Sequence, residues 1–194
     1  NQSHIGAADT SVTLVANTAD TAEWTKLHLN QVQYDDSLLD YFKQINPEEN
    51  NFIVFHLKGS HFNFINRYPQ EFAKFSKPNT YDLIPNYIDS IAYTDYVLQQ
   101  IQEYAAKYLN LQAMVYFSDH ATIPDKRRSP NFGGFANVRI PLFTYFADEY
   151  ISSHPQVYSA LKANQNKYWT NDLAYELICG ILDIKSNWMA WTYF

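Results

Sequence analysis

The strongest constraint on the fold is a strand, a long helix and a second strand that follow one another along the chain. The run FIVFHL (52–57) is apolar, β-branched and aromatic, which is typical of a central strand. Apolar residues then recur at helical spacing from Ile84 to Tyr108, with Pro85 in the first turn. AMVYF (113–117) predicts the next strand. Such a unit favours a right-handed crossover between parallel strands, so we expect an α/β fold with a mainly parallel sheet.

Three further segments complete the predicted elements. DDSLLDYFKQI (35–45) has apolar residues at helical spacing, and Asp35 or Asp36 is placed to cap that helix. VRIPLFTYF (138–146) predicts a third strand. A last amphipathic helix is predicted to start with Thr170 as its N-cap. The chain shows no internal repeat and no clear domain boundary.

The composition indicates a packed protein without a general affinity for polyanions. The 194 residues are 46% hydrophobic and 17% aromatic, which is enough to bury a substantial core. The formal net charge of −6 gives no attraction for nucleic acid, and we expect no nucleic-acid partner. The single cysteine, Cys179, lies in an apolar pattern and predicts a buried thiol. No signal peptide and no membrane-spanning stretch is visible.

Both predicted strands of the crossover end on residues that carry chemistry. The first runs into KGSH, which ends on His61, and the second runs into SDH, which places Asp119 beside His120. Parallel strands joined by a crossover end at the same edge of a sheet, and ligand sites of open α/β sheets lie beyond that edge. We therefore expect His61, Asp119 and His120 on one side of the molecule.

This residue set favours a divalent metal. One carboxylate with one or two imidazoles suits Zn²⁺, or Mn²⁺ if more oxygen ligands join, and the ion would polarise a phosphoryl or sulfuryl oxygen. The residues alone leave a second interpretation open, in which Ser118 and Asp119 are ordinary turn residues and His120 is solvated. Lys126, Arg127 and Arg128 follow the candidate site. They suit the phosphate of a lipid head group or an anionic acceptor, and a solvated charged loop is the alternative.

Four stretches, taken in order, resemble a known family. They are FIVFHLKGSHFNFINRYPQEFAKF, YIDSIAYTDYVLQQI, VYFSDH and VRIPLFTYFADEYISSHP. The combination resembles the catalytic domain of bacterial phosphoethanolamine transferases, in the sulfatase branch of the alkaline phosphatase superfamily. The resemblance covers about residues 1–183. It implies a three-layer sandwich with a mainly parallel sheet, of which residues 1–194 are a C-terminal portion without the N-terminal strands.

The resemblance also implies an activity. Asp119 and His120 fall on metal ligands, with Zn²⁺ or Mn²⁺ as the ion, and His61 falls on a histidine that assists the transferred phosphate or the leaving group. In the family a threonine takes phosphoethanolamine from phosphatidylethanolamine and passes it to an envelope lipid or glycan, as in lipopolysaccharide modification. The protein would be anchored in the bacterial inner membrane, with this domain facing the periplasm or the cell exterior. That threonine is expected upstream of this chain, so we expect the chain alone to bind metal weakly and to be inactive.

Some residues depart from the family pattern. Ala121 and Thr122 stand where the family usually has Gly-Glu, and Phe62 and Asn63 stand where it usually has Gly-Pro. A further family histidine has no obvious counterpart. Two alternatives therefore stay open: a sulfatase or phosphodiesterase with water as the acceptor, and a non-catalytic module that binds an envelope glycan or lipid.

Overall fold

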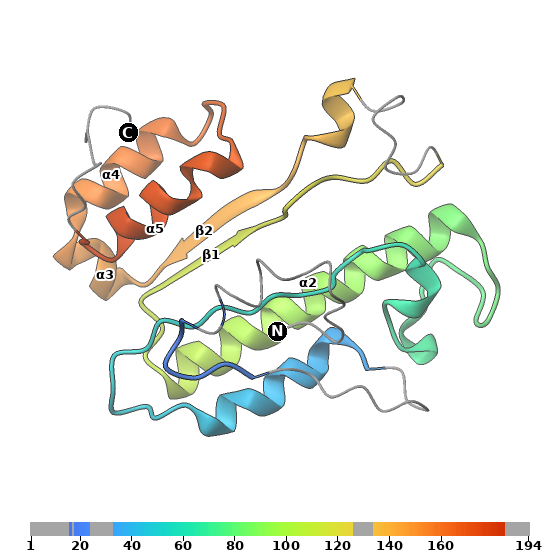
Figure 1. Ribbon diagram of the computed structural model, residues 1–194, viewed down its shortest axis with the longest axis horizontal. Coiled ribbons are helices and arrows are strands. Elements are labelled where there is room, and N and C mark those ends of the chain that lie inside the picture. The colour runs from blue at the N-terminus through green and yellow to red at the C-terminus, as the bar shows by residue number, and fades with distance from the viewer. Residues whose placement is uncertain (1–15, 17, 24–32, 126–133, 185–194) are drawn as a thin grey trace. The chain divides into compact units, whose positions relative to one another are not determined.

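Helix α2 (Leu83–Tyr108) is the longest element of the computed structural model, which describes residues 16, 18–23, 33–125 and 134–184 (Figure 1). It confirms the helix predicted from the apolar spacing. Pro85 lies in its first turn, where the missing backbone N–H costs no helical hydrogen bond. The chain divides into two compact units, Asn1–Asn110 and Leu111–Phe194, and each is described by itself.

The buried face of α2 is more polar than the sequence pattern predicted. Ile84, Ile88 and Ile91, which were assigned to the apolar face, are 39% to 47% exposed. The buried side chains are Asn86, Asp89, Ser90, Tyr93, Thr94, Val97, Ile101 and Ala105. The difference arises because the loop 74–76 packs against the helix and presents backbone N–H groups that need acceptors. Asp89 supplies them, so hydrogen bonding selects the buried side of α2 along its first half.

A chain of buried hydrogen bonds ties this loop to the helix. Asn86 Nδ2 donates to Tyr68 Oη at 2.9 Å, and Tyr68 Oη lies 2.8 Å from Ser76 Oγ. Ser76 Oγ donates to Asp89 Oδ2 at 2.6 Å. Since the Asp89 carboxylate only accepts, every donor in the chain points toward it. Asn86, Tyr68 and Asp89 are fully buried, and the side chain of each has a hydrogen-bond partner within this chain.

The 3-10 helix η2 (Asp35–Gln44) packs on α2 in the first unit. It confirms a helix over 35–45, with the tighter 3-10 hydrogen-bonding pattern. Leu38 and Phe42 are buried, and Phe42 stacks on Tyr104 of α2 with ring centroids 4.5 Å apart. The predicted cap is wrong, because Tyr34 is the N-cap residue and no side chain caps the helix. Asp35 instead accepts hydrogen bonds from a distant turn.

No strand forms over 52–57 in the part of the chain that the structure describes. The segment is extended but pairs with no described strand, and Phe52 and Val54 are 62% and 71% exposed. A central strand needs neighbouring strands that pair with its backbone and cover both of its faces. Here the half-buried Phe55 packs on Phe42, while Phe52 and Val54 stay exposed. The expected parallel pairing across α2 is therefore not found here. Two short 3-10 helices follow, η3 (Phe64–Asn66) and η4 (Gln70–Phe72).

The second unit contains the sheet that the structure describes. Strands β1 (Ala113–Phe117) and β2 (Leu142–Phe146) pair from Ala113 with Phe146 to Phe117 with Leu142 (Figure 1). They confirm the strand over 113–117 and shorten the one predicted over 138–146, because Pro141 has no N–H to donate to a ladder. The pairing of these two strands is antiparallel, and the mainly parallel sheet expected for the domain stays a prediction.

Helices cover one side of this hairpin and form the core of the unit. Tyr150, Leu177 and Ile181 are buried there, and Val115 and Phe146 pack against them. Cys179 is buried as predicted. None of the described helices has the length and hydropathy needed to cross a membrane. The elements are η5 (Gly134–Asn137), α3 (Asp148–Ser153), α4 (Pro155–Asn164), η6 (Asn171–Leu173) and α5 (Ala174–Ile181), with Thr170 as the N-cap residue of η6.

Candidate functional site

The sequence Ser118-Asp119-His120 forms a turn directly after β1. The ladder with β2 ends at Phe117, and two hydrogen bonds form within the turn itself. Ser118 Oγ donates to the carbonyl of His120 at 2.8 Å, and the N–H of His120 donates to Asp119 Oδ1 at 2.8 Å. These bonds fix the backbone of the turn and engage Oδ1 of Asp119, whereas Oδ2 takes part in neither of them.

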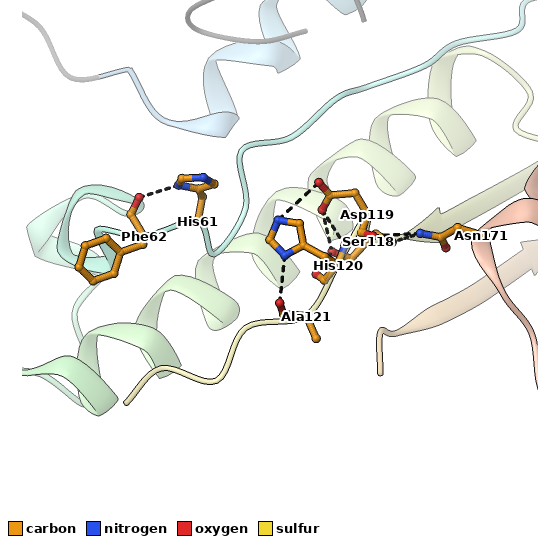
Figure 2. A network of polar contacts seen from close by, with 7 residues as sticks. All are labelled: His61, Phe62, Ser118, Asp119, His120, Ala121 and Asn171. Atoms are coloured by element: carbon orange, nitrogen blue, oxygen red, sulfur yellow. Dashed lines mark hydrogen bonds and ion pairs between the residues drawn. The ribbon is translucent and has the colours of Figure 1, made fainter. Parts of the chain in front are cut away.

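Asp119 and His120 converge in this turn, as the sequence predicted for residues just past a strand. Asp119 Oδ2 lies 3.6 Å from Nε2 of His120 (Figure 2). The two side chains differ in exposure, since Asp119 is 80% exposed and His120 is 23% exposed. The imidazole is therefore held against the protein, while the carboxylate projects toward solvent.

Both ring nitrogens of His120 face oxygen atoms. Nδ1 lies 3.0 Å from the carbonyl of Ala121, which only accepts, and Nε2 faces Oδ2 of Asp119. In the neutral ring with the proton on Nδ1, Nε2 has a free lone pair on the side of Asp119. A histidine that donates one ring N–H to a backbone carbonyl and presents the other nitrogen is the usual state of a metal ligand.

Asn171 also belongs to this turn, although the sequence analysis did not single it out. Its Nδ2 lies 3.1 Å from the carbonyl of Ser118 and 3.1 Å from the carbonyl of Asp119 (Figure 2). Asn171 opens η6, and the sequence indicated only a helix start near Thr170. No periodicity connects positions 52 and 53 residues apart, so no local signal identifies this contact.

His61 lies in the other compact unit, after the turn at Lys58 and Gly59. Its side chain is exposed, and Nδ1 lies 2.6 Å from the carbonyl of Phe62. In the neutral ring with the proton on Nδ1, Nε2 has the free lone pair. Because each unit is described by itself, the predicted meeting of His61 with Asp119 and His120 stays a prediction.

A partly buried carboxylate, that of Asp35, holds the turn that precedes His61. Asp35 accepts the N–H of Lys58 at 3.0 Å and the N–H of Gly59 at 2.7 Å. Gly59 has φ +53°, a conformation that favours glycine. Burial raises the pKa of Asp35, although the two amides and the positive charge of Arg67 oppose the shift. Burial disfavours the charged form of cations as well, so it lowers the pKa of Lys58 and of Arg67.

The predicted substrate-binding residues Lys126, Arg127 and Arg128 lie outside the described residues. Within 16, 18–23, 33–125 and 134–184, no group of three or more His, Cys, Asp or Glu side chains is arranged to hold a metal ion. The pair Asp119 and His120 nevertheless fits such an ion. Two ligands of one tetrahedral zinc ion, each about 2.0–2.2 Å from it, lie roughly 3.3–3.6 Å apart. The 3.6 Å between Oδ2 and Nε2 falls at the upper end of that range.

Comparison with protein families gives one match, to the sulfatase family model over residues 3–178. Among curated proteins, the Kdo(2)-lipid A phosphoethanolamine 7''-transferase of Salmonella typhimurium is 28% identical over 134 residues, which are 60% of this chain and 23% of that protein. The phosphoethanolamine transferase EptC of Escherichia coli O18:K1:H7 is 26% identical over 182 residues, 82% of this chain and 31% of that protein. The matches thus span less than a third of the length of these relatives.

Among solved structures, the chain is similar to the C-terminal periplasmic domain of EcEptC from Escherichia coli in complex with Zn. The TM-score is 0.60 at 22% identity, over 80% of this chain and 49% of that one. A second crystal structure of the same domain gives a TM-score of 0.57 at 20% identity. At this identity the likeness establishes the fold alone, which is sulfatase-like.

Proposed function

The chain belongs to the sulfatase family, and we propose from this that it forms part of a metal-dependent phosphoethanolamine transferase. One observation of the chain's own residues supports the proposal most directly. Asp119 Oδ2 and His120 Nε2 place a carboxylate oxygen and an imidazole nitrogen 3.6 Å apart, at the end of β1. Two of the relatives that match this chain are named as phosphoethanolamine transferases, and one solved relative is a complex with Zn.

In this proposal Asp119 and His120 hold a divalent ion, zinc or manganese. When bound, the ion supplies Lewis acidity toward a phosphoryl oxygen. His61 acts as the acid–base group: Nε2 takes a proton from an attacking hydroxyl or, once protonated, gives it to a leaving oxygen. Lys126, Arg127 and Arg128 bind the phosphate of the head group or of an anionic acceptor, because guanidinium groups contact phosphate bidentately.

The remaining parts of the proposed reaction come from the family resemblance. A threonine outside this chain attacks phosphatidylethanolamine and carries phosphoethanolamine covalently, and an envelope lipid or glycan then accepts it. We propose that the protein is anchored in the bacterial inner membrane, with this domain in the periplasm or outside the cell. We further propose that the whole domain is a three-layer sandwich with a mainly parallel sheet.

Removal of one proposed ligand tests the metal centre. Asp119→Ala in the full-length protein should weaken zinc binding by tenfold or more, measured by competition with a chromophoric chelator, because one charged ligand is lost. Asp125→Ala is the matched control, since Asp125 is an exposed acid a few residues further along the same segment. An unchanged zinc affinity in Asp119→Ala would show that this carboxylate is not a ligand.

Activity assays test the reaction. The protein should release the head group of phosphatidylethanolamine and should not cleave aryl sulfate esters, and His61→Ala should lower transfer by about 10²–10⁴-fold. Zinc affinity should stay within twofold of wild type in His61→Ala, because that residue is proposed to act on protons and not on the metal. Cleavage of a sulfate ester or of a phosphodiester with water as the acceptor would instead identify a hydrolase.

One observation favours a different class of function. The described residues supply two metal ligands, and Ala121 and Thr122 stand where the family usually has Gly-Glu. A module that binds an envelope glycan or lipid without catalysis would need no metal at this site. Binding of such vesicles or glycans with equal affinity by wild type and Asp119→Ala, without turnover, would support that alternative.

A further inference from the structure

We propose that Asn171 is a positioning residue for the metal-ligand pair, acting through the backbone of the turn that carries Asp119 and His120. The inference rests on the proposed function, because it concerns the same pair of ligands. It adds a residue from a different part of the fold, at the start of η6, which contacts neither ligand side chain in the hydrogen bonds described above.

The hydrogen bonds of Asn171 form a fork. Its single Nδ2 group has two hydrogens, and two consecutive carbonyls, those of Ser118 and Asp119, lie at 3.1 Å each (Figure 2). One amide group thus engages the peptide units on both sides of the Asp119 Cα. Because a bond to one carbonyl alone would allow rotation about that bond, the fork fixes the orientation of this stretch more tightly.

The fork connects the turn to a rigid part of the unit. Asn171 is the first residue of η6, which leads directly into α5. Helix α5 is anchored by Leu177 and Ile181 in the core, and Tyr150 Oη donates to the carbonyl of Ile181 at 2.7 Å. The ladder of β1 ends at Phe117, so the carbonyls of Ser118 and Asp119 lie beyond the sheet. Asn171 therefore supports the carbonyls of Ser118 and Asp119 beyond the sheet, and the N–H of Ala121 donates to the carbonyl of Asn137 at 3.1 Å.

The local bonds of the turn carry this orientation to the ligand atoms. The N–H of His120 fixes Oδ1 of Asp119, and the carbonyl of Ala121 fixes Nδ1 of His120. Both side chains are thus tied to the backbone of the turn that Asn171 holds. A shift of that backbone would change the 3.6 Å separation of Oδ2 and Nε2, on which shared coordination depends.

Two substitutions test this role. Asn171→Ala removes the amide, and Asn171→Leu removes both donors while keeping a side chain of similar volume. Asn164→Ala is the matched control, because Asn164 lies in the same unit and its Nδ2 donates at 2.8 Å to the carbonyl of Ala160, within α4. Zinc dissociation constants of the full-length proteins are measured by chelator competition, and backbone hydrogen exchange around residues 118–121 is measured without metal.

Both Asn171 variants should bind zinc about tenfold more weakly than wild type, which is the usual loss when a supporting group of a metal ligand is removed. Exchange around 118–121 should become faster in both. Asn164→Ala should change neither measurement by more than twofold. If the Asn171 variants keep wild-type zinc affinity while Asp119→Ala loses it, the positioning role is wrong and the metal centre stands. If Asp119→Ala also keeps wild-type affinity, the metal centre itself is wrong.

Discussion

The two compact units hold their candidate histidines by different means. In the first unit the turn before His61 is held by the carboxylate of Asp35, whereas in the second the turn before His120 is held by the amide of Asn171. In both units Nδ1 of the histidine lies within hydrogen-bonding distance of the carbonyl of the next residue. The supports of the two turns differ in one property: a carboxylate titrates and an amide does not.

The supports of the two turns should therefore respond differently to pH. The first unit relies on two carboxylates, the partly buried Asp35 and the buried Asp89, that accept backbone N–H groups from separate loops. The turn of the second unit is held by groups that stay neutral over the working range of pH, apart from its own ligands. Substitution of Asp35 or Asp89 should accordingly lower the free energy of unfolding more than substitution of Asn171.

The largest effect is expected for Asp89→Ala. The substitution leaves the N–H groups of Lys74, Phe75 and Ser76, and the Ser76 hydroxyl, without their acceptor in a buried setting. We expect the free energy of unfolding to fall by about 3–5 kcal/mol, measured by urea denaturation. Asp95→Ala, an exposed acid on the same helix, should have little effect. A loss below about 1 kcal/mol for Asp89→Ala would show that the loop finds other acceptors.

The next effect is expected for Asp35→Ala. The amides of Lys58 and Gly59 lose their acceptor, and Arg67 loses its nearby negative charge. We expect a loss of about 1–2 kcal/mol in the free energy of unfolding at pH 7. Asp40→Ala is the control on the same 3-10 helix, because its carboxylate pairs with the exposed Lys43. If Asp35→Ala and Asp40→Ala were equally stable, the carboxylate of Asp35 would contribute no more to stability than a surface acid.

The pH dependence should have opposite signs for the two carboxylates. Burial raises the pKa of Asp35, so the native state binds that proton more tightly than the unfolded chain. Its contribution to stability is thus present below the unfolded pKa of about 3.9 and is lost as the pH rises through the folded pKa. Wild type should lose stability relative to Asp35→Asn as the pH rises through this window.

For Asp89, burial acts to raise the pKa, but hydrogen bonds from Ser76, Lys74 and Phe75 outweigh it and leave the pKa lowered. Its contribution is present above the unfolded pKa of about 3.9 and is lost as the pH falls through the folded pKa. Wild type should therefore lose its advantage over Asp89→Ala on acidification. Urea denaturation from pH 2 to 7 measures both trends, and a common sign would contradict the assignment of the two carboxylates.

The smallest effect is expected for Asn171→Ala. Its two bonds are made by a neutral amide at an exposed position, so the free energy of unfolding should fall by only about 0.5–1 kcal/mol. The loss should be the same at pH 5 and pH 8, because the amide does not titrate. A pH-dependent loss would mean that Asn171 acts through the charge of Asp119 and not through the backbone.

Much of the local structure was predictable from the sequence. The apolar spacing before Tyr108 predicted α2, and AMVYF predicted β1. The residue types after β1 indicated Asp119 and His120 as candidate metal ligands, and the structure brings their side chains together. These features depend on residues within a few positions of one another, so periodicity and residue type carry the information.

Other features were decided only in the tertiary structure. The apolar run at 52–57 was read as a strand, yet its pairing requires a neighbour that no local pattern specifies. Asp35 was read as a helix cap, and instead it accepts amides 23 and 24 residues away. Asn171 reaches a turn more than 50 residues earlier in the chain.

Local sequence was enough to place α2 and β1 and to indicate which side chains carry the candidate chemistry. The tertiary structure decided which donors meet which acceptors across the fold. The physical reason is that backbone conformation responds to neighbouring residues, whereas a buried N–H or C=O takes whatever partner packing brings within about 3 Å.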